Sequence, residues 1–274
     1  MSQIMNGKTA LVTGGSRGIG RAIAERLGAQ GVAVAVNYAR NEQLAQEVVK
    51  GIIAKGGKAV AVQADVAKPS EVRRLFQEAE RALGGLDIVV ANAGAGFHGS
   101  LLDTSPDAMA RLLDLNYMGT FLLARAALPH LLRARRANLI VVSSIVGRRG
   151  LGWGGAYAAT KFAQVGLAES LRVELTGTPV RVGVVFPVST DTEFRDAMAR
   201  EQGFEVRGTG PRQPAGHVAR AIVRGIASGR PEIYPHGPSK LLSIVSVVFP
   251  GLADRIVRRY GRQPIPKADR AEAR

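Results

Sequence analysis

Tyr157 and Lys161 are the two residues of this sequence whose types and spacing best suit chemistry. They stand four positions apart in a run of small residues that favours a helix, and side chains with this spacing lie on one helix face, about 6 Å apart at Cβ. An ammonium beside a phenol favours the phenolate and lowers a pKa that is ordinarily about 10. Tyr157 is therefore predicted to exchange a proton near neutral pH as a general acid or base. The alternative is a solvated lysine one turn from a packed tyrosine.

Two further polar residues are candidates for the same site. Ser144 follows an apolar run over residues 139–142, and its hydroxyl is placed to hold a substrate oxygen. Asn116 lies inside a long helical pattern that starts at Ser105 and continues through Leu131. Asparagine is unfavourable as filler within a helix, so we expect a polar role for it, with a solvated position as the simpler alternative.

A glycine-rich turn near the start of the chain predicts a binding site for the pyrophosphate of a dinucleotide. The turn separates an apolar run over residues 8–12 from a helical apolar stripe, and its residues are Gly14, Ser16, Arg17, Gly18, Ile19 and Gly20. Glycines let the backbone approach a phosphate, and a helix N-terminus offers free N–H groups. The spacing differs from the G-x-G-x-x-G of many dehydrogenases, and an ordinary glycine turn is the alternative.

The choice of dinucleotide depends on the residues after the predicted strand over 32–36. An acidic residue at this place binds a ribose 2′-hydroxyl in many dinucleotide folds, but here Asn37 follows and the first carboxylate is Glu42, in the next helix. Arg17 and Arg40 are placed to attract a 2′-phosphate. We therefore predict NADP(H) in preference to NAD(H), with solvated loop charges as the alternative for both arginines.

The elements that must position these residues alternate between strand and helix. Predicted strands cover residues 8–12, 32–36, 58–63, 86–91, 139–142, 180–186 and 232–234, with helical patterns between them. The alternation predicts an α/β fold of Rossmann type, a doubly wound parallel sheet with helices on both faces. We assign residues 1–237 to one catalytic domain and 238–274 to a C-terminal extension. Asp65 and Asn92 stand at carboxyl ends of strands, where ligands bind, although both are also common turn residues.

Composition limits the class of protein. The chain has 274 residues, is 46% hydrophobic and carries a formal net charge of +15 without any cysteine. A chain without cysteine has no disulfide framework or thiolate metal site, and we predict no metal. The N-terminus lacks the apolar stretch of a signal peptide, so we predict a cytoplasmic protein. The basic residues are spread along the chain without a nucleic-acid reading motif, which favours a solvated arginine-rich surface.

Taken together and in order, these motifs resemble the short-chain dehydrogenase/reductase family. The resemblance covers roughly residues 6–235 and rests on Thr13-Gly14-x-x-x-Gly18-x-Gly20, Asn92-Ala93-Gly94, Asn116, Ser144 and Tyr157-x-x-x-Lys161. Each motif is weak alone, but their joint order is specific. The resemblance implies a seven-stranded sheet and NAD(P)-dependent hydride transfer between an alcohol and a carbonyl.

The resemblance also implies a role for each matching residue. Tyr157 would transfer the proton, Ser144 would orient the substrate oxygen, and Lys161 would bind the nicotinamide ribose and lower the pKa of the tyrosine. Asn116 would support a relay water beside Lys161. Further cofactor contacts are expected from Asn37, Asp65 (adenine), Val66, Asn92 (adenosine ribose), Ala93, Gly94, Pro187 and Thr192 (carboxamide). The Pro-Gly common in the family is Pro187-Val188 here, which puts the local backbone path in doubt.

Two regions lie outside these motifs. Residues 191–212 would form the substrate lid. Phe194, Met198 and Phe204 could line an apolar pocket for a lipophilic carbonyl. Phe97, His98 and Trp153 could face the same space, and packing is the alternative for all six. The apolar run over residues 241–249 is too short to span a bilayer, which needs about 20 residues. We favour a lid or subunit contact for it over a basic amphipathic patch, residues 238–262, on an anionic membrane. Residues 264–274 are predicted to be a mobile tail.

The function predicted from the sequence is thus an NADP(H)-dependent oxidoreductase acting on a small carbonyl or alcohol. The alternative is a non-catalytic dinucleotide-binding regulator or scaffold with a basic surface, and specific nucleic-acid binding lacks support. A homodimer or homotetramer is expected by resemblance, through the helices that carry Asn116 and Tyr157.

Overall fold

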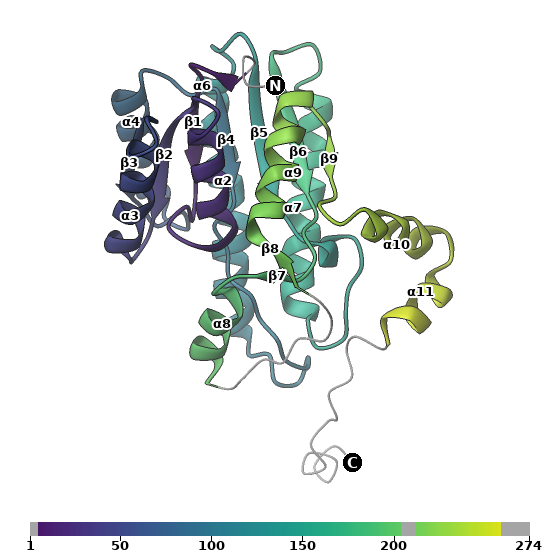
Figure 1. Cartoon of the computed structure of the whole chain (residues 1–274). Coiled ribbons are helices and arrows are strands. Elements are labelled where there is room, and N and C mark those ends of the chain that lie inside the picture. The colour runs from purple at the N-terminus through teal and green to yellow at the C-terminus, as the bar shows by residue number, and fades with distance from the viewer. Residues whose placement is uncertain (1–4, 204–211, 259–274) are drawn as a thin grey trace.

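A seven-stranded parallel sheet forms the centre of the computed structural model, which describes residues 5–203 and 212–258 (Figure 1). The strands lie in the order β3-β2-β1-β4-β5-β6-β9. Their bounds are β1 Thr9–Val12, β2 Ala33–Tyr38, β3 Ala59–Gln63, β4 Ile88–Ala91, β5 Ala137–Val142, β6 Val180–Val185 and β9 Glu232–Ile233. The predicted Rossmann-type fold is confirmed.

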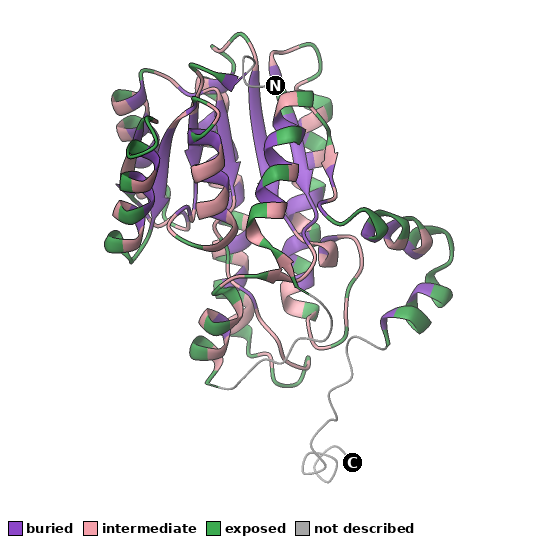
Figure 2. Cartoon of the chain, viewed as in Figure 1, coloured by how far each residue is buried: buried purple, intermediate pink, exposed green. Residues whose placement is uncertain are grey.

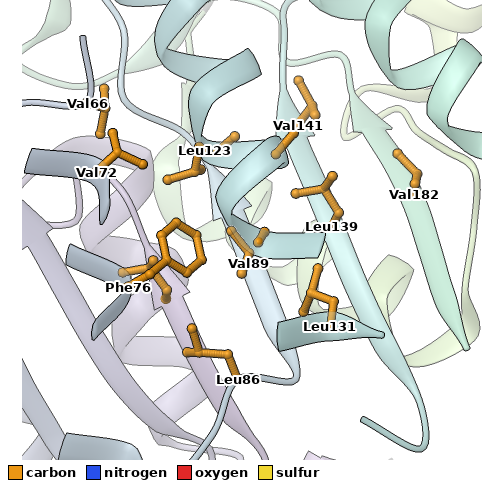
Figure 3. Packing of buried hydrophobic residues seen from close by; sticks show 14 of the residues in the cluster. Val66, Val72, Phe76, Leu86, Val89, Leu123, Leu131, Leu139, Val141 and Val182 are labelled. Carbon is orange, nitrogen blue, oxygen red and sulfur yellow. The ribbon is translucent and has the colours of Figure 1, made fainter. Parts of the chain in front are cut away.

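Helices cover both faces of this sheet (Figure 1). One face carries α2 (Gly18–Gly28), α3 (Glu42–Ile53) and α9 (Ala215–Ser228), and the other carries α4 (Pro69–Leu83), α6 (Gly119–Leu131) and α7 (Gly155–Glu174). The strands between the two layers are almost wholly buried (Figure 2). In Figure 3, Phe76 and Leu123 reach the sheet beside Val89 and Leu139. Burial of each large apolar side chain stabilises the fold by about 1.5–3 kcal/mol, so the sheet is a rigid base for the loops at its edge.

The remaining elements lie at the carboxyl ends of the strands or beyond the sheet. They are α5 (Pro106–Leu112), α8 (Phe194–Gln202), α10 (Gly237–Val248), α11 (Pro250–Val257) and a small sheet of β7 (Thr190–Asp191) and β8 (Gln213–Pro214). In Figure 1, α10 and α11 stand away from the sheet. No helix in the described ranges is both long and apolar enough to cross a membrane.

Two local predictions are wrong. Strand β2 continues past residue 36 to Tyr38, because Asn37 and Tyr38 pair with Val62 and Gln63 of β3. The long helix expected around Asn116 is interrupted by a π-helix, η1 (Leu113–Met118), between α5 and α6. Apolar periodicity does not separate a single π-turn from a continuous α-helix, and such turns are frequent at functional sites.

From β1 the chain adds strands first on one side (β2, β3) and then on the other (β4, β5, β6, β9), so the direction of the strand order changes between β1 and β4. Side-chain hydrogen bonds connect the ends of these two strands. The hydroxyl of Thr13 accepts from the backbone N–H groups of Asn92 (3.0 Å) and Ala93 (3.1 Å). The side-chain amide of Asn92 donates to the carbonyl of Thr13 (2.9 Å). Ligands of doubly wound sheets bind at this switch point, so the glycine turn that follows β1 is held where a dinucleotide would lie.

Replacing Gly20 by alanine is predicted to destabilise this turn severely. A Cβ at position 20 would lie 2.2 Å from the carbonyl oxygen of Gly14 and 2.6 Å from the amide of Asn92. Because the closer atom belongs to the backbone, the turn itself must move, and we expect a loss of at least about 2 kcal/mol in the free energy of unfolding. Urea denaturation of the unmodified protein and of Gly20→Ala measures this difference in the free energy of unfolding.

Gly51 provides the matched control within a helix. A Cβ there meets no atom within 4 Å, so Gly51→Ala is expected to stabilise α3 by about 0.5–1 kcal/mol. Equal unfolding midpoints for the two variants would contradict the close packing assigned to Gly20.

Candidate active site

Tyr157, Ser144 and Lys161 meet where strand β5 ends and helix α7 begins. Ser144 follows β5, and its hydroxyl accepts from the backbone N–H of Val146 (3.3 Å). Tyr157 lies in the first turn of α7, half-buried, and its phenol is hydrogen-bonded to Ser144. The Nζ atom of Lys161 lies 5.6 Å from the centre of the Tyr157 ring. The structure thus brings together the three residues that the sequence grouped.

Lys161 is buried among uncharged oxygen atoms. The residue is 4% exposed, and Nζ donates to the carbonyl of Val142 (3.1 Å) and to Oε1 of Gln164 (3.0 Å). Burial without a carboxylate partner disfavours the charged amine, and it lowers the pKa of Lys161 to about 7. The amine therefore titrates in the range where an enzyme works.

The expected lowering of the tyrosine pKa by Lys161 is wrong for this structure. Burial raises the pKa of Tyr157 above its ordinary value, and the hydrogen bond to Ser144 opposes this only in part. The sequence argument counted the charge of the lysine but not the desolvation of both groups. At neutral pH the phenol consequently holds its proton, which is the state of a proton donor.

Asn116 is fully buried within the π-helix, and its polar groups all have protein partners. Its side chain accepts from the N–H of Ala95 (2.8 Å) and donates to the carbonyl of Ala95 (2.9 Å) and to Thr160 (3.0 Å). Its backbone carbonyl accepts from Thr120 Oγ1 and from Gln164 Nε2, both at 2.7 Å. The amide of Gln164 thus lies between Lys161 and the backbone carbonyl of Asn116, and a relay water beside Lys161 stays a prediction.

Gln164 is the residue that the sequence analysis missed. It is completely buried and bridges Lys161 to Asn116 and to Thr120 (2.8 Å). A signal was present, because a glutamine three residues after Lys161 falls on the same helix face as the lysine. Without the position of the π-helix, however, no partner for it could be named.

The glycine turn has the form that a pyrophosphate requires. Gly14 and Gly18 adopt left-handed conformations (φ +59° and +56°), and a Cβ at Gly18 would lie 3.3 Å from the side chain of Thr192. Arg17 precedes α2 without capping it through its side chain, and the first turn of α2 holds no acidic residue. Its N–H groups and positive dipole end can receive an anion, so the residues present fit a dinucleotide.

Several predicted cofactor residues also hold this turn together. The buried amide of Asn37 accepts from the N–H of Gly14 (3.3 Å) and donates to the carbonyl of Ala64 (3.0 Å). Asn92 donates to the carbonyls of Thr13 and Gly14, and Asp65 accepts from the N–H of Ala67 in the turn before α4 (3.0 Å). For Asn92 and Asp65 this is the turn role that the sequence left open.

The other residues predicted to contact the cofactor lie around the same carboxyl edge of the sheet. A Cβ at Gly94 would lie 2.9 Å from Asn116 Oδ1 and 3.8 Å from Lys161 Nζ, while Ala93 adjoins Gly14. Val66 is buried against Gly119, and Ile19 packs against the core on the α2 face. The carbonyl of Pro187 accepts from Ile145 (2.9 Å). Ser16 is half-buried, and the side chains of Arg17 and Arg40 are exposed at the ends of the glycine turn and of β2.

Apolar side chains from α8 lie beside Tyr157. The ring of Phe194 is 6.2 Å from the ring of Tyr157, and Phe194 and Met198 pack against Gly96. Gln202 fastens α8 by bonding to the backbone N–H (3.1 Å) and carbonyl (2.8 Å) of His98.

The loop that contains His98 also has contacts on its other side. The carbonyl of Trp153, a residue with φ +65°, accepts from the N–H of Gly99 (2.8 Å), and the ring of Phe97 packs against Gly99. Phe204 lies outside the described residues. Across residues 5–203 and 212–258, no three His, Cys, Asp or Glu side chains gather as metal ligands.

Comparison with known proteins agrees with this geometry. The profile of the family described as short chain dehydrogenase matches residues 8–203. A 3-oxoacyl-[acyl-carrier-protein] reductase FabG of Staphylococcus aureus is 39% identical over 194 residues, which cover 71% of this chain and 79% of that reductase. Tetrahydroxynaphthalene reductase of Pyricularia oryzae is 36% identical over 201 residues, covering 73% and 70%.

Solved structures are similar over most of the chain. A short chain dehydrogenase from Burkholderia cenocepacia in complex with NADP is 34% identical with a TM-score of 0.75, covering 84% of this chain and 96% of the other. A short chain dehydrogenase/reductase from Burkholderia phymatum in complex with NAD is 25% identical with a TM-score of 0.81, covering 95% and 98%. Relatives therefore bind either dinucleotide.

The low pKa of Lys161 predicts a stability that rises with pH. Between about 7, its pKa in the fold, and about 10.4, its value in an unfolded chain, the unfolded state binds more protons, so unfolding becomes less favourable as the pH increases. From pH 7 to 9 this contributes on the order of 2 kcal/mol. Urea unfolding should show this rise in the free energy of unfolding for the unmodified protein. The rise should be absent in Lys161→Met, which lacks the amine.

Gln164→Glu tests whether the lack of a carboxylate partner is what lowers the pKa of Lys161. A carboxylate beside Nζ raises the pKa of Lys161, so the rise between pH 7 and 9 should shrink. The same slope in the protein and in Lys161→Met would contradict the lowered pKa of this buried amine.

Proposed function

This chain belongs to the short-chain dehydrogenase family, and we propose that within it the protein is an NADP(H)-dependent reductase of a lipophilic carbonyl compound. The observation that carries the proposal is the meeting of Ser144, Tyr157 and Lys161 beside Gly94 and the glycine turn. Oxidoreductase chemistry with NAD(P) follows from the family. The direction, the proton donor and the substrate class are our inference.

The protein's own groups supply a proton and a binding site for the carbonyl oxygen. Tyr157 holds its proton at neutral pH and donates it to the carbonyl oxygen, while the hydroxyl of Ser144 donates a hydrogen bond to the same atom. The amine of Lys161, 5.6 Å from the centre of the ring, stabilises the phenolate that remains when the amine carries its proton. The nicotinamide of a bound cofactor supplies the hydride.

The residues proposed to hold the cofactor surround the switch point of the sheet. The glycine turn and the start of α2 receive the pyrophosphate, Lys161 the nicotinamide ribose, and Thr192, with Pro187, the carboxamide. Asp65 and Val66 border the adenine, and Asn92, Ala93 and Gly94 border the sugars. Thr192 beside Gly18 supports this assignment, because it brings the two ends of the proposed site together.

A lipophilic substrate is proposed because of the apolar side chains around the phenol. The ring of Phe194 lies 6.2 Å from that of Tyr157, yet Phe194 is 38% exposed, so it offers a surface to a ligand. By their names, the matched reductases act on 3-oxoacyl-[acyl-carrier-protein] and on tetrahydroxynaphthalene, which supports a carbonyl compound with an apolar part.

Cytoplasmic location and self-association belong to the same proposal. The chain has no cysteine, as suits a reducing compartment. Met118 of the π-helix and Phe162 and Val173 of α7 are exposed large apolar residues, which supports a homodimer or homotetramer built on these helices.

Tyr157→Phe is expected to remove turnover while leaving the fold intact. Loss of a general acid costs about 100- to 10,000-fold in kcat, which NADPH oxidation over a series of ketones and aldehydes would measure. NADPH binding, followed by fluorescence, serves as the control and should persist. Full activity in this variant would refute the role of Tyr157, and nucleotide binding by the unmodified protein without turnover would favour the non-catalytic alternative.

Arg17→Ala and Arg40→Ala are expected to weaken the binding of NADPH more than the binding of NADH. Each arginine is exposed at the edge of the proposed adenosine site, and no carboxylate ends β2. Loss of one charge-assisted contact to a 2′-phosphate should raise the Kd of NADPH about tenfold and change that of NADH little. Arg26→Ala, at the other end of α2, is the matched control. Equal losses for both nucleotides would refute the 2′-phosphate assignment.

A further inference from the structure

Helices α10 and α11 form a helical pair that lies beyond the family match, which ends at residue 203. The pair stands away from the sheet and is largely exposed in Figure 2. Its large apolar side chains face solvent, with Val247 80%, Leu241 64% and Phe249 60% exposed. Ile244, Val248, Leu252 and Ile256 are exposed as well, and we call the exposed apolar residues of α10 and α11 together the apolar face of the pair.

Helix α10 is reversed relative to an ordinary surface helix. Its buried residues are Ser239, Ser243 and Ser246, whereas a surface helix normally buries its apolar stripe. The serine hydroxyls donate to the carbonyls of His236, Ser239 and Leu242 within the same helical segment. Because these hydroxyls are satisfied locally, the serine side can be buried and the apolar side left outward.

Contacts with the body of the protein fix this orientation. Asp254 of α11 pairs with Arg149, in the segment that leads to α7. Ser243 is hydrogen-bonded to Tyr234 beside β9, and Ala253 and Val257 of α11 are buried. These contacts hold both helices against the rest of the protein. The exposure of the apolar face is therefore a property of folded helices and does not come from local unfolding.

The charges around the apolar face are positive. In the described part of the pair, the exposed charged residues are Lys240, Arg255 and Arg258, together with Asp254, which Arg149 neutralises. The chain as a whole carries +15. A second copy docked face to face would bring these like charges together, which is unfavourable. A negatively charged surface matches both the apolar side chains and the basic residues.

We propose that the apolar face of α10 and α11 binds the surface of an anionic lipid bilayer. Val247, Phe249 and Leu241 enter the boundary between headgroups and acyl chains, and the basic residues contact lipid phosphates. The pair lies on the membrane and does not cross it, since α10 has only 12 residues. This binding does not depend on the proposed catalytic reaction.

Vesicle co-sedimentation of the full chain tests the proposal. We expect binding to vesicles with about one quarter phosphatidylglycerol in phosphatidylcholine, and much weaker binding to phosphatidylcholine alone. The variant Leu241→Ser/Val247→Ser/Phe249→Ser should bind the anionic vesicles about tenfold or more weakly. Lys240→Gln/Arg255→Gln/Arg258→Gln should lose the preference for anionic lipid.

Leu101 and Leu102 provide the matched control, because they are exposed apolar residues outside the helical pair. They are 89% and 84% exposed, and Leu101→Ser/Leu102→Ser should bind vesicles like the unmodified protein. Circular dichroism checks the fold of each variant. Unchanged vesicle binding in the triple serine variant would mean that net charge alone attracts the protein to the vesicles, and it would overturn the proposal. A change of oligomeric state in that variant, by light scattering and without loss of vesicle binding, would assign the face to a second copy.

Discussion

The burial of one amine among uncharged oxygens is the constraint on which the candidate site depends. Nζ of Lys161 needs acceptors, and it finds them at the end of β5 and on its own helix, in Val142 and Gln164. The amide of Gln164 in turn needs an acceptor, which is the backbone carbonyl of Asn116. That carbonyl lies in the π-helix η1 and also accepts from Thr120. The position of Lys161 is therefore coupled to an irregularity in a different helix.

A second set of contacts holds the opposite side of the site. Thr13 and Asn92 tie the ends of β1 and β4, and Asn37 ties the glycine turn to the end of β3. Of these residues, Asn37 and Asn92 are ones that the sequence analysis assigned to a cofactor. The same residues can border a ligand and shape its site, because a dinucleotide fold presents backbone as well as side chains to its ligand.

The sequence was sufficient for the fold and for the grouping of the three main candidate residues, because both depend on local patterns. Buried parallel strands are short apolar runs, and Ser144, Tyr157 and Lys161 stand at fixed places relative to one strand and one helix. The π-helix, the partner of Gln164 and the raised pKa of Tyr157 were not predictable, because each depends on atoms far away in the chain. The reversed helix α10 was missed for a related reason: a run broken by Ser243 and Ser246 shows an apolar side but not which side meets the protein.

The fixed amide of Gln164 also limits where a hydrogen ion can go at the site. A carboxamide neither gains nor loses a proton near neutrality, and that of Gln164 is locked between Lys161, Thr120 and Asn116. A hydrogen ion that leaves the amine of Lys161 therefore cannot be taken up by Gln164, although Gln164 is its hydrogen-bond acceptor.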